Sequence, residues 1–308
     1  MQSSNNEQTP AFTYGLLLDW IPVDNINWFR LCRNPNAIPL LEANPQHIVY
    51  STLSENPNAI HILEQNPDKI DWDFISSNPS AGHLFDQSLL FDNLNICRLI
   101  HNPSAFHLIN ENRELIPNLW DIAGNTCNEA IDLLEIMIED YFEYDQEMRK
   151  PQSKRYLKHI CTMKKCYHHS HYFGGLYELD WQLLSANPSA VRILEKYPEQ
   201  IDWTGICKNP NAIHIIEANL EQADWTELSA NPNAIHLIEA NMDNVDWQTL
   251  CYNPNAIHII EKNMHMVDWT VLSLNPSAIG ILEATPQHVN WDNLWNNTAI
   301  FANNAGLK

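Results

Sequence analysis

A unit of 22 residues recurs along this chain and constrains its fold more than any other feature. Three consecutive copies, NPNAIHIIEANLEQADWTELSA, NPNAIHLIEANMDNVDWQTLCY and NPNAIHIIEKNMHMVDWTVLSL, begin at Asn209, Asn231 and Asn253. A short fixed period is typical of solenoids, in which each unit buries its apolar face only against its neighbours. We therefore predict an all-α fold, an α-solenoid of short helix pairs, for which a binding scaffold is the default role.

Each unit contains the start signals of two short helices. Asn-Pro opens the first, because Asn caps free backbone donors and Pro fits the first helical position. This helix should end near a second Asn, such as Asn241, for which we expect the left-handed terminating conformation. The second helix opens at Asp-Trp, with Asp246 as its cap and Trp247 in the core. Neither helix is long enough to be stable alone, so stacking must supply the stability.

A helical wheel of the first helix separates an apolar side from an exposed side. Ala234, Leu237 and Ile238 cluster together, whereas His236 falls opposite them and Glu239 flanks it. Histidines of neighbouring units would lie too far apart to share a metal ion, whereas the His and Glu of one unit are three residues apart and can touch. The candidate binding surface is an exposed ladder of these side chains: His61, Glu64, His214, Glu217, His236, Glu239, His258 and Glu261.

The regularity of the repeat divides the chain into five segments. These are an N-terminal tail and cap (1–23), an N-terminal repeat array (24–135), an acidic-then-basic insertion (136–178), a C-terminal repeat array (179–296) and a C-terminal cap and tail (297–308). The N-terminal array degrades toward its end, whereas the C-terminal array is nearly perfect. We expect the insertion to be helical and to interrupt an otherwise continuous stack.

Two interpretations of the insertion remain open. It could be a helical hairpin whose acidic and basic halves neutralise each other, or a functional element displayed on the scaffold. Its cysteines and histidines could form a zinc site, although the spacing is not that of a standard finger; the candidate ligands are Cys161, Cys166, His168 and His171. Basic residues interleaved with aromatic ones could also contact nucleic acid.

Charge and composition exclude several classes of function. The net charge of −21 makes nucleic acid an unfavourable partner for the whole surface, because phosphate binding needs a basic face. The chain has no Gly-rich phosphate loop, no nucleophile motif and no isolated carboxylate pair, so we expect neither enzymatic activity nor a resident cofactor. No apolar run approaches the length of a membrane span, and the first residues lack the features of a signal peptide.

The pattern NPNAIHLIEAN-x₄-DW-x₂-LS resembles tandem repeats of uncharacterised proteins from giant double-stranded DNA viruses, mimivirus-like and related groups. The resemblance covers residues 24–135 and 179–296. It implies a viral protein inside the host cell, in the cytoplasm or the virion, and it transfers no catalytic or binding residue. We expect a scaffold for protein–protein interaction with a host or viral partner. The alternatives are a zinc- or nucleic-acid-binding module carried by the insertion and a self-assembling structural virion protein.

Overall fold

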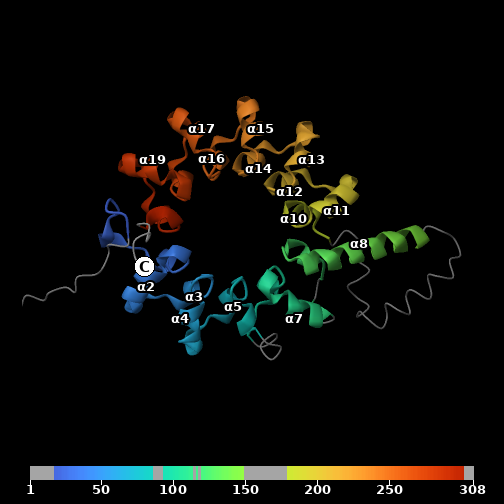
Figure 1. Ribbon diagram of the computed structural model, residues 1–308, viewed down its shortest axis with the longest axis horizontal. Helices are drawn as coiled ribbons and strands as arrows, with labels where there is room; N and C mark the ends of the chain where they lie inside the picture. The colour runs from blue at the N-terminus through green and yellow to red at the C-terminus, as the bar shows by residue number, and fades with distance from the viewer. Residues whose placement is uncertain (1–16, 86–92, 114–115, 117–118, 149–178, 302–308) are drawn as a thin grey trace, which may run out of the picture.

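The computed structural model describes residues 17–85, 93–113, 116, 119–148 and 179–301. Within these ranges the protein is all-α, and the one pairing of strand type is a single antiparallel bridge between Leu17 and Phe301. Short α-helices alternate with 3-10 turns, and together they form a ring (Figure 1). The predicted all-α class and the repeating helix pattern are thus confirmed.

Two helices alternate in each unit and occupy two layers of the ring. The helix that follows the Asn-Pro pair, called here the first helix, lies on the outer side of the ring, as the labelled upper arc of Figure 1 shows. The second helix lies nearer the centre and begins at an aromatic residue, except in α6, which begins at Ile96. The first helices are α2 (Ile38–Ala43), α4 (Ile60–Glu64), α7 (Phe106–Glu111), α11 (Val191–Lys196), α13 (Ile213–Glu217), α15 (Ile235–Ala240), α17 (Ile257–Lys262) and α19 (Ile279–Ala284). The second helices are α1 (Trp28–Leu31), α3 (Tyr50–Leu53), α5 (Trp72–Ile75), α6 (Ile96–Leu99), α10 (Trp181–Ala186), α12 (Trp203–Lys208), α14 (Trp225–Ala230), α16 (Trp247–Leu250), α18 (Trp269–Leu272) and α20 (Trp291–Leu294).

The helix caps match the sequence signals at one end and differ at the other. The Asp246 side chain accepts a hydrogen bond from the backbone N–H of Thr249, so Asp caps the second helix as predicted. The left-handed conformation predicted for Asn241 is wrong, because its φ is −137° and its ψ 46°. Its side-chain amide instead donates to the Leu237 carbonyl at 2.8 Å. The amide satisfies a free carbonyl at the helix end, which leaves the backbone no need to turn left-handed.

The asparagine that opens each unit is buried and joins it to the preceding unit. Its side-chain oxygen accepts from the N–H two residues later, which is the predicted cap, and its Nδ2 donates to two carbonyls of the preceding unit. In Asn231, for example, Nδ2 donates to the carbonyls of Cys207 at 2.9 Å and Asn209 at 3.1 Å, and Oδ1 accepts from Asn233. We call the series the asparagine ladder; its eleven members are Asn34, Asn56, Asn78, Asn102, Asn125, Asn187, Asn209, Asn231, Asn253, Asn275 and Asn297.

The first and last members of the asparagine ladder are joined by a hydrogen bond. Nδ2 of Asn34 donates to the carbonyls of Trp295 at 3.2 Å and Asn297 at 3.0 Å, across 261 and 263 residues. Beside them, the Leu18 N–H donates to the Ile300 carbonyl at 2.9 Å. The two segments assigned above to the chain ends, 1–23 and 297–308, are therefore in contact with each other. One apolar cluster extends through this closure and includes Leu17, Leu41, Leu294 and Ile300.

The units on either side of the insertion are direct neighbours. Nδ2 of Asn187 donates to the carbonyls of Ala123 and Asn125, both at 2.8 Å, so the asparagine ladder passes across a gap of 62 residues. Helix α8 (Asn128–Met148) begins as the first helix of its unit, with Ala130 and Leu134 fully buried, and then continues beyond the length of the others. It points away from the ring in Figure 1. Residues 149–178 lie outside the described part of the chain.

The core consists mainly of aliphatic side chains, and the tryptophans cover its edge. Leu228, Ala234 and Ile238 have no exposed surface, whereas Trp225 and Trp247 are half-buried and pack against this core. The prediction that the tryptophan of each unit lies inside the core is therefore wrong in part. Leucine three residues later occupies the interior, and the indole, at the start of its helix, keeps one part of its surface outside.

A small residue after the second helix links consecutive units. The Ser229 hydroxyl donates to the Trp225 carbonyl at 2.7 Å and accepts from the Asp246 N–H of the next unit at 3.1 Å. Cysteine replaces serine at three of these positions, and the thiol of Cys251 likewise donates to a carbonyl, that of Trp247, at 3.2 Å. Serine and cysteine interchange here because both are small and can donate and accept hydrogen bonds.

Candidate functional site

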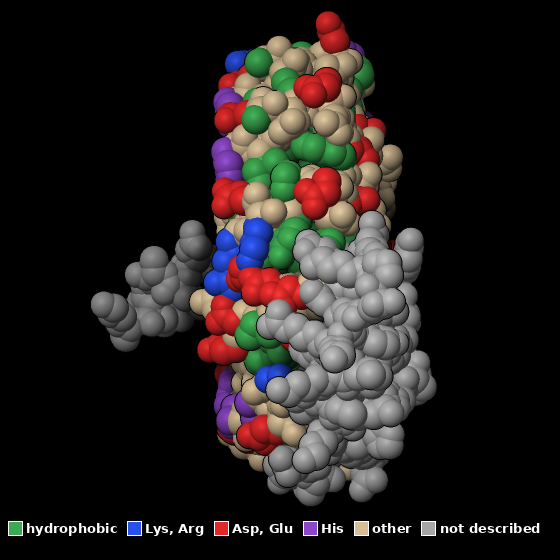
Figure 2. Space-filling view, turned by 90° about the vertical axis from the view of Figure 1, so that its right-hand side faces the viewer, with side chains coloured by type: hydrophobic (Ala, Val, Ile, Leu, Met, Phe, Trp, Pro, Cys, Tyr) green, Lys and Arg blue, Asp and Glu red, His purple; other side chains and the backbone are tan. Residues whose placement is uncertain are grey.

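Histidine and glutamate side chains form pairs on the outer helices, and we call the series the His–Glu belt. Each pair joins Nε2 of a histidine to Oε1 of a glutamate 19 residues earlier, in the preceding unit. All of these side chains are about half-exposed, and histidines and carboxylates follow one another along one edge of the ring in Figure 2. The pairs are His61–Glu42 (2.8 Å), His83–Glu64 (3.0 Å), His214–Glu195 (3.0 Å), His236–Glu217 (2.5 Å) and His258–Glu239 (2.8 Å).

The belt confirms the exposure that the helical wheel predicts, but it corrects the expected pairing. Within one unit His236 and Glu239 are three residues apart, yet each contacts a neighbouring unit: His236 reaches Glu217, and Glu239 accepts from His258. The histidine near the start of one first helix thus meets the glutamate at the end of the preceding one. Glu261, the last predicted member, is also exposed, and glycine stands at the histidine position of the next unit. Whether any of these residues binds a partner stays a prediction.

Arginine continues the belt across the insertion. Arg192 occupies the histidine position of its unit, and its Nε lies 3.3 Å from Oε2 of Glu135 in α8. A hydrogen bond to Asp132 is the main cause of the raised pKa of the Arg192 guanidinium. One turn later in α11, Lys196 contacts Glu135 and Glu139. The Phe142 ring stacks on Tyr197, the residue that follows α11, with ring centroids 5.0 Å apart.

The contacts of α8 with α11 concern the two interpretations of the insertion, the neutralising hairpin and the displayed element. The acidic residues at its start pair with the C-terminal array, at least for Glu139 with Lys196, so part of its charge is matched outside the insertion. Its basic half, with the zinc candidates Cys161, Cys166, His168 and His171, lies outside the described residues. The hairpin and the displayed element therefore both stay predictions.

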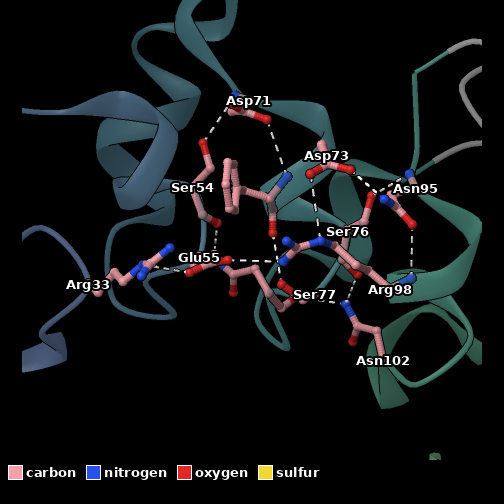
Figure 3. Close-up of polar contacts among 12 residues, drawn as sticks. Arg33, Ser54, Glu55, Asp71, Asp73, Ser76, Ser77, Asn95, Arg98 and Asn102 are labelled. Carbon is pink, nitrogen blue, oxygen red and sulfur yellow. Dashed lines mark hydrogen bonds and ion pairs between the residues drawn. The ribbon is translucent and has the colours of Figure 1, made fainter. Parts of the chain in front are cut away.

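A second polar cluster joins the first units of the ring, and Figure 3 shows it in detail. Glu55 accepts from two arginines, with Oε2 2.8 Å from Nε of Arg33 and Oε1 3.0 Å from Nη1 of Arg98. The Arg98 guanidinium lies 4.8 Å from the centroid of the Phe74 ring and 3.6 Å from Asp73. Sequence analysis missed this cluster because the side-chain type at its positions changes from unit to unit: the residue before the ladder asparagine is Arg33 in one unit and Glu55 in the next.

The charges of this second cluster balance. Two guanidinium groups face two carboxylates, and the Phe74 ring lies against both arginines. Glu55 is the least exposed charged member, at 22% of its side chain. Since each arginine already has a carboxylate and an aromatic partner, the cluster fits a structural link between units better than a site for a free anion.

The described residues also bear on metal binding and on membrane insertion. No group of three or more His, Cys, Asp or Glu side chains among them could hold a metal ion. In the same part of the chain, no helix has both the length and the apolar character that a bilayer crossing requires. Burial raises the pKa of the Cys207 thiol to about 11, which keeps this thiol protonated and unreactive near neutral pH.

Comparison with known proteins assigns neither a family nor a function to this chain. No family model, no curated protein and no solved structure matches this chain.

Proposed function

We propose that the chain is an α-solenoid closed into a ring and that it acts as a non-enzymatic scaffold for protein–protein interaction. The observation that carries this proposal is the His–Glu belt. It places one chemically similar, half-exposed pair on the outer helix of successive units. A repeated surface of this kind suits a partner that contacts several units at once, because a solenoid presents extended surfaces rather than a single pocket. A host or viral protein is the partner that the resemblance to giant-virus repeats favours.

The closure of the ring argues against assembly through the ends of the array. A self-assembling structural protein would need an unpaired terminal unit to receive the next copy, as heterologous contacts that do not close make filaments. Here Asn34 uses both of its amide hydrogens on carbonyls of the last unit. We therefore expect a constant molar mass by light scattering across concentrations, and a mass that rises with concentration would favour the structural alternative.

Affinity capture with matched variants tests the proposal. The belt variant His236→Gln/His258→Gln removes two pairs, and the control His101→Gln/His265→Gln makes the same chemical change at exposed histidines outside the belt. We expect a partner that both the unmodified protein and the control retain and that the belt variant loses. Equal retention by the two variants would place binding elsewhere. Catalytic turnover by the purified protein would contradict the non-enzymatic scaffold. Stoichiometric zinc in the purified protein would favour the alternative of a zinc module in the insertion.

A further inference from the structure

In three units the aromatic residue that begins the second helix is in contact with a histidine or lysine side chain of the next unit. The His47 ring stacks on Trp28 with centroids 4.5 Å apart and planes inclined by 9°. At the opposite end of the repeat series, His288 stacks on Trp269 at 4.6 Å and 17°. In a third unit the side chain is a lysine: Nζ of Lys69 lies 4.6 Å from the centroid of the Tyr50 ring. Each of these side chains comes 19 residues after its aromatic partner, so they occupy one structural position, called here the covering position.

In the C-terminal array the covering position is neutral in consecutive units. Trp181, Trp203 and Trp225 correspond to Gln200, Gln222 and Asn244, which occupy the ends of their 3-10 turns. Gln222 and Asn244 are exposed, so another group could displace either side chain at little cost.

A carboxylate precedes the neutral residue in each of these three units. Glu199, Glu221 and Asp243 are all exposed. At the two histidine-covered rings the preceding residue is instead an uncharged glutamine, Gln46 or Gln287. A neutral covering residue and a preceding carboxylate therefore coincide at these three consecutive rings, whereas at the next ring, Trp247, the corresponding residues are Met266 and His265. The three acidic–aromatic sites are Trp181 with Glu199, Trp203 with Glu221, and Trp225 with Asp243.

From this pattern we infer that the three acidic–aromatic sites bind an extended, basic peptide segment of a partner protein, one lysine or arginine side chain to each site. A cation over an aromatic ring is attracted by the negative face of the ring, and the adjacent carboxylate adds to that attraction. Lys69 over Tyr50 shows the geometry within this chain. The arc from residue 179 to residue 301 favours such a partner as well, since it carries 15 Asp and Glu against 4 Lys and Arg, a net charge of −11 (4 − 15).

The spacing of the sites defines the spacing of the basic residues. Packed helices of consecutive units lie about 8–10 Å apart. A peptide in the extended polyproline II conformation advances about 3.1 Å per residue with three residues per turn, so every third side chain lies on the same side, about 9 Å from the last. A basic residue at every third position would therefore meet successive rings. This inference rests on the proposed scaffold function and specifies the chemical class of its partner.

Peptide binding to the full chain tests the inference. The probe is a fluorescein-labelled synthetic nonapeptide with lysine at every third position on a Gly/Ser background, followed by fluorescence anisotropy. The variant Gln200→Lys/Gln222→Lys/Asn244→Lys places a lysine at each covering position, where Lys69 occurs naturally over Tyr50. We expect the three introduced lysines to lie over the rings and block the peptide from the acidic–aromatic sites. We expect its affinity for the peptide to fall by about tenfold or more.

A charge-matched control separates site occupation from a general change in charge. Ala218→Lys/Ala240→Lys/Ala284→Lys adds the same three charges at exposed ends of the outer helices, where Lys196 and Lys262 occur naturally. Since these added charges lie in solvent and are screened, we expect a loss of only about twofold. Circular dichroism should show that both variants fold.

Three results would overturn the inference: no binding of the peptide, equal losses in the two lysine variants, or equal affinity for a peptide with lysine at every second position. None of them would contradict the scaffold itself. A captured partner that is lost with His236→Gln/His258→Gln would still support the proposed function, with binding at the belt and not at the acidic–aromatic sites.

Discussion

Replacing one member of the asparagine ladder tests what holds consecutive units together. In Asn231→Ala the protein loses three hydrogen bonds: two from Nδ2, at 2.9 and 3.1 Å, and one to Oδ1, at 3.0 Å. Asn231 is 2% exposed, so water cannot replace these partners in the folded state. At about 1 kcal/mol for each bond, and with two carbonyls left buried, we expect the free energy of unfolding to fall by about 3–5 kcal/mol.

The same substitution at the closure distinguishes a ring from an open stack. In a ring, Asn34→Ala removes the bonds to Trp295 and Asn297 and should cost as much as Asn231→Ala. In an open stack Asn34 would keep only its capping bond to Asn36, and its loss would cost about 1 kcal/mol.

Urea unfolding followed by far-ultraviolet circular dichroism measures both effects. The control is Asn233→Ala, which removes an exposed amide with one bond to the Pro210 carbonyl and should cost less than about 1 kcal/mol. A loss below about 1 kcal/mol for Asn231→Ala would refute the role of the ladder. A large loss for Asn231→Ala together with a small one for Asn34→Ala would refute the closure alone.

Three further outcomes are expected. Gly205→Ala should lower the free energy of unfolding by about 1–3 kcal/mol, because the added Cβ would lie 2.2 Å from a backbone oxygen of α10. Gly280→Ala, with nothing within 4 Å, should raise it by about 0.5–1 kcal/mol, and the reverse order in a urea titration would contradict the close approach of α12 to α10. Iodoacetamide at pH 8 should label exposed Cys97 much faster than Cys207, whose pKa of about 11 leaves little thiolate; equal labelling by mass spectrometry would show that Cys207 is accessible. His236→Gln should change the thermal midpoint little, since exposed ion pairs contribute about 0–1 kcal/mol, and a drop of many degrees would mean that the belt holds the units together.

Signals that act within one unit could be interpreted correctly from the sequence. Asp224 before Trp225 indicates a helix cap, and its carboxylate does accept from two backbone N–H groups of α14. The exposure of His236 follows from the period of the first helix alone. These features need no knowledge of the neighbouring unit, because a few consecutive residues determine them.

Features that depend on two units were predicted incompletely. The opening asparagine fits a cap so well that no second role was expected, yet a cap can remain at the surface, whereas Asn209 is fully buried. Burial of a side-chain amide requires partners for both of its hydrogens, and these lie in the preceding unit. The pairing of His258 with Glu239, instead of with Glu261 three residues later in its own helix, has the same origin.

Whether the array closes into a ring depends on the number of units and on the rotation between consecutive units. The sequence of a single unit does not determine that rotation. Eleven ladder members around one ring correspond to a turn of about 33° per unit, a small rotation of the kind that gives repeat proteins their curvature. A slightly different rotation would produce an open spiral from the same local pattern. Once closed, the array has no terminal unit that lacks a neighbour, and each irregular unit is held from both sides. The ring can therefore accommodate α8 and the insertion after it, because Asn187 restores the ladder directly to Asn125.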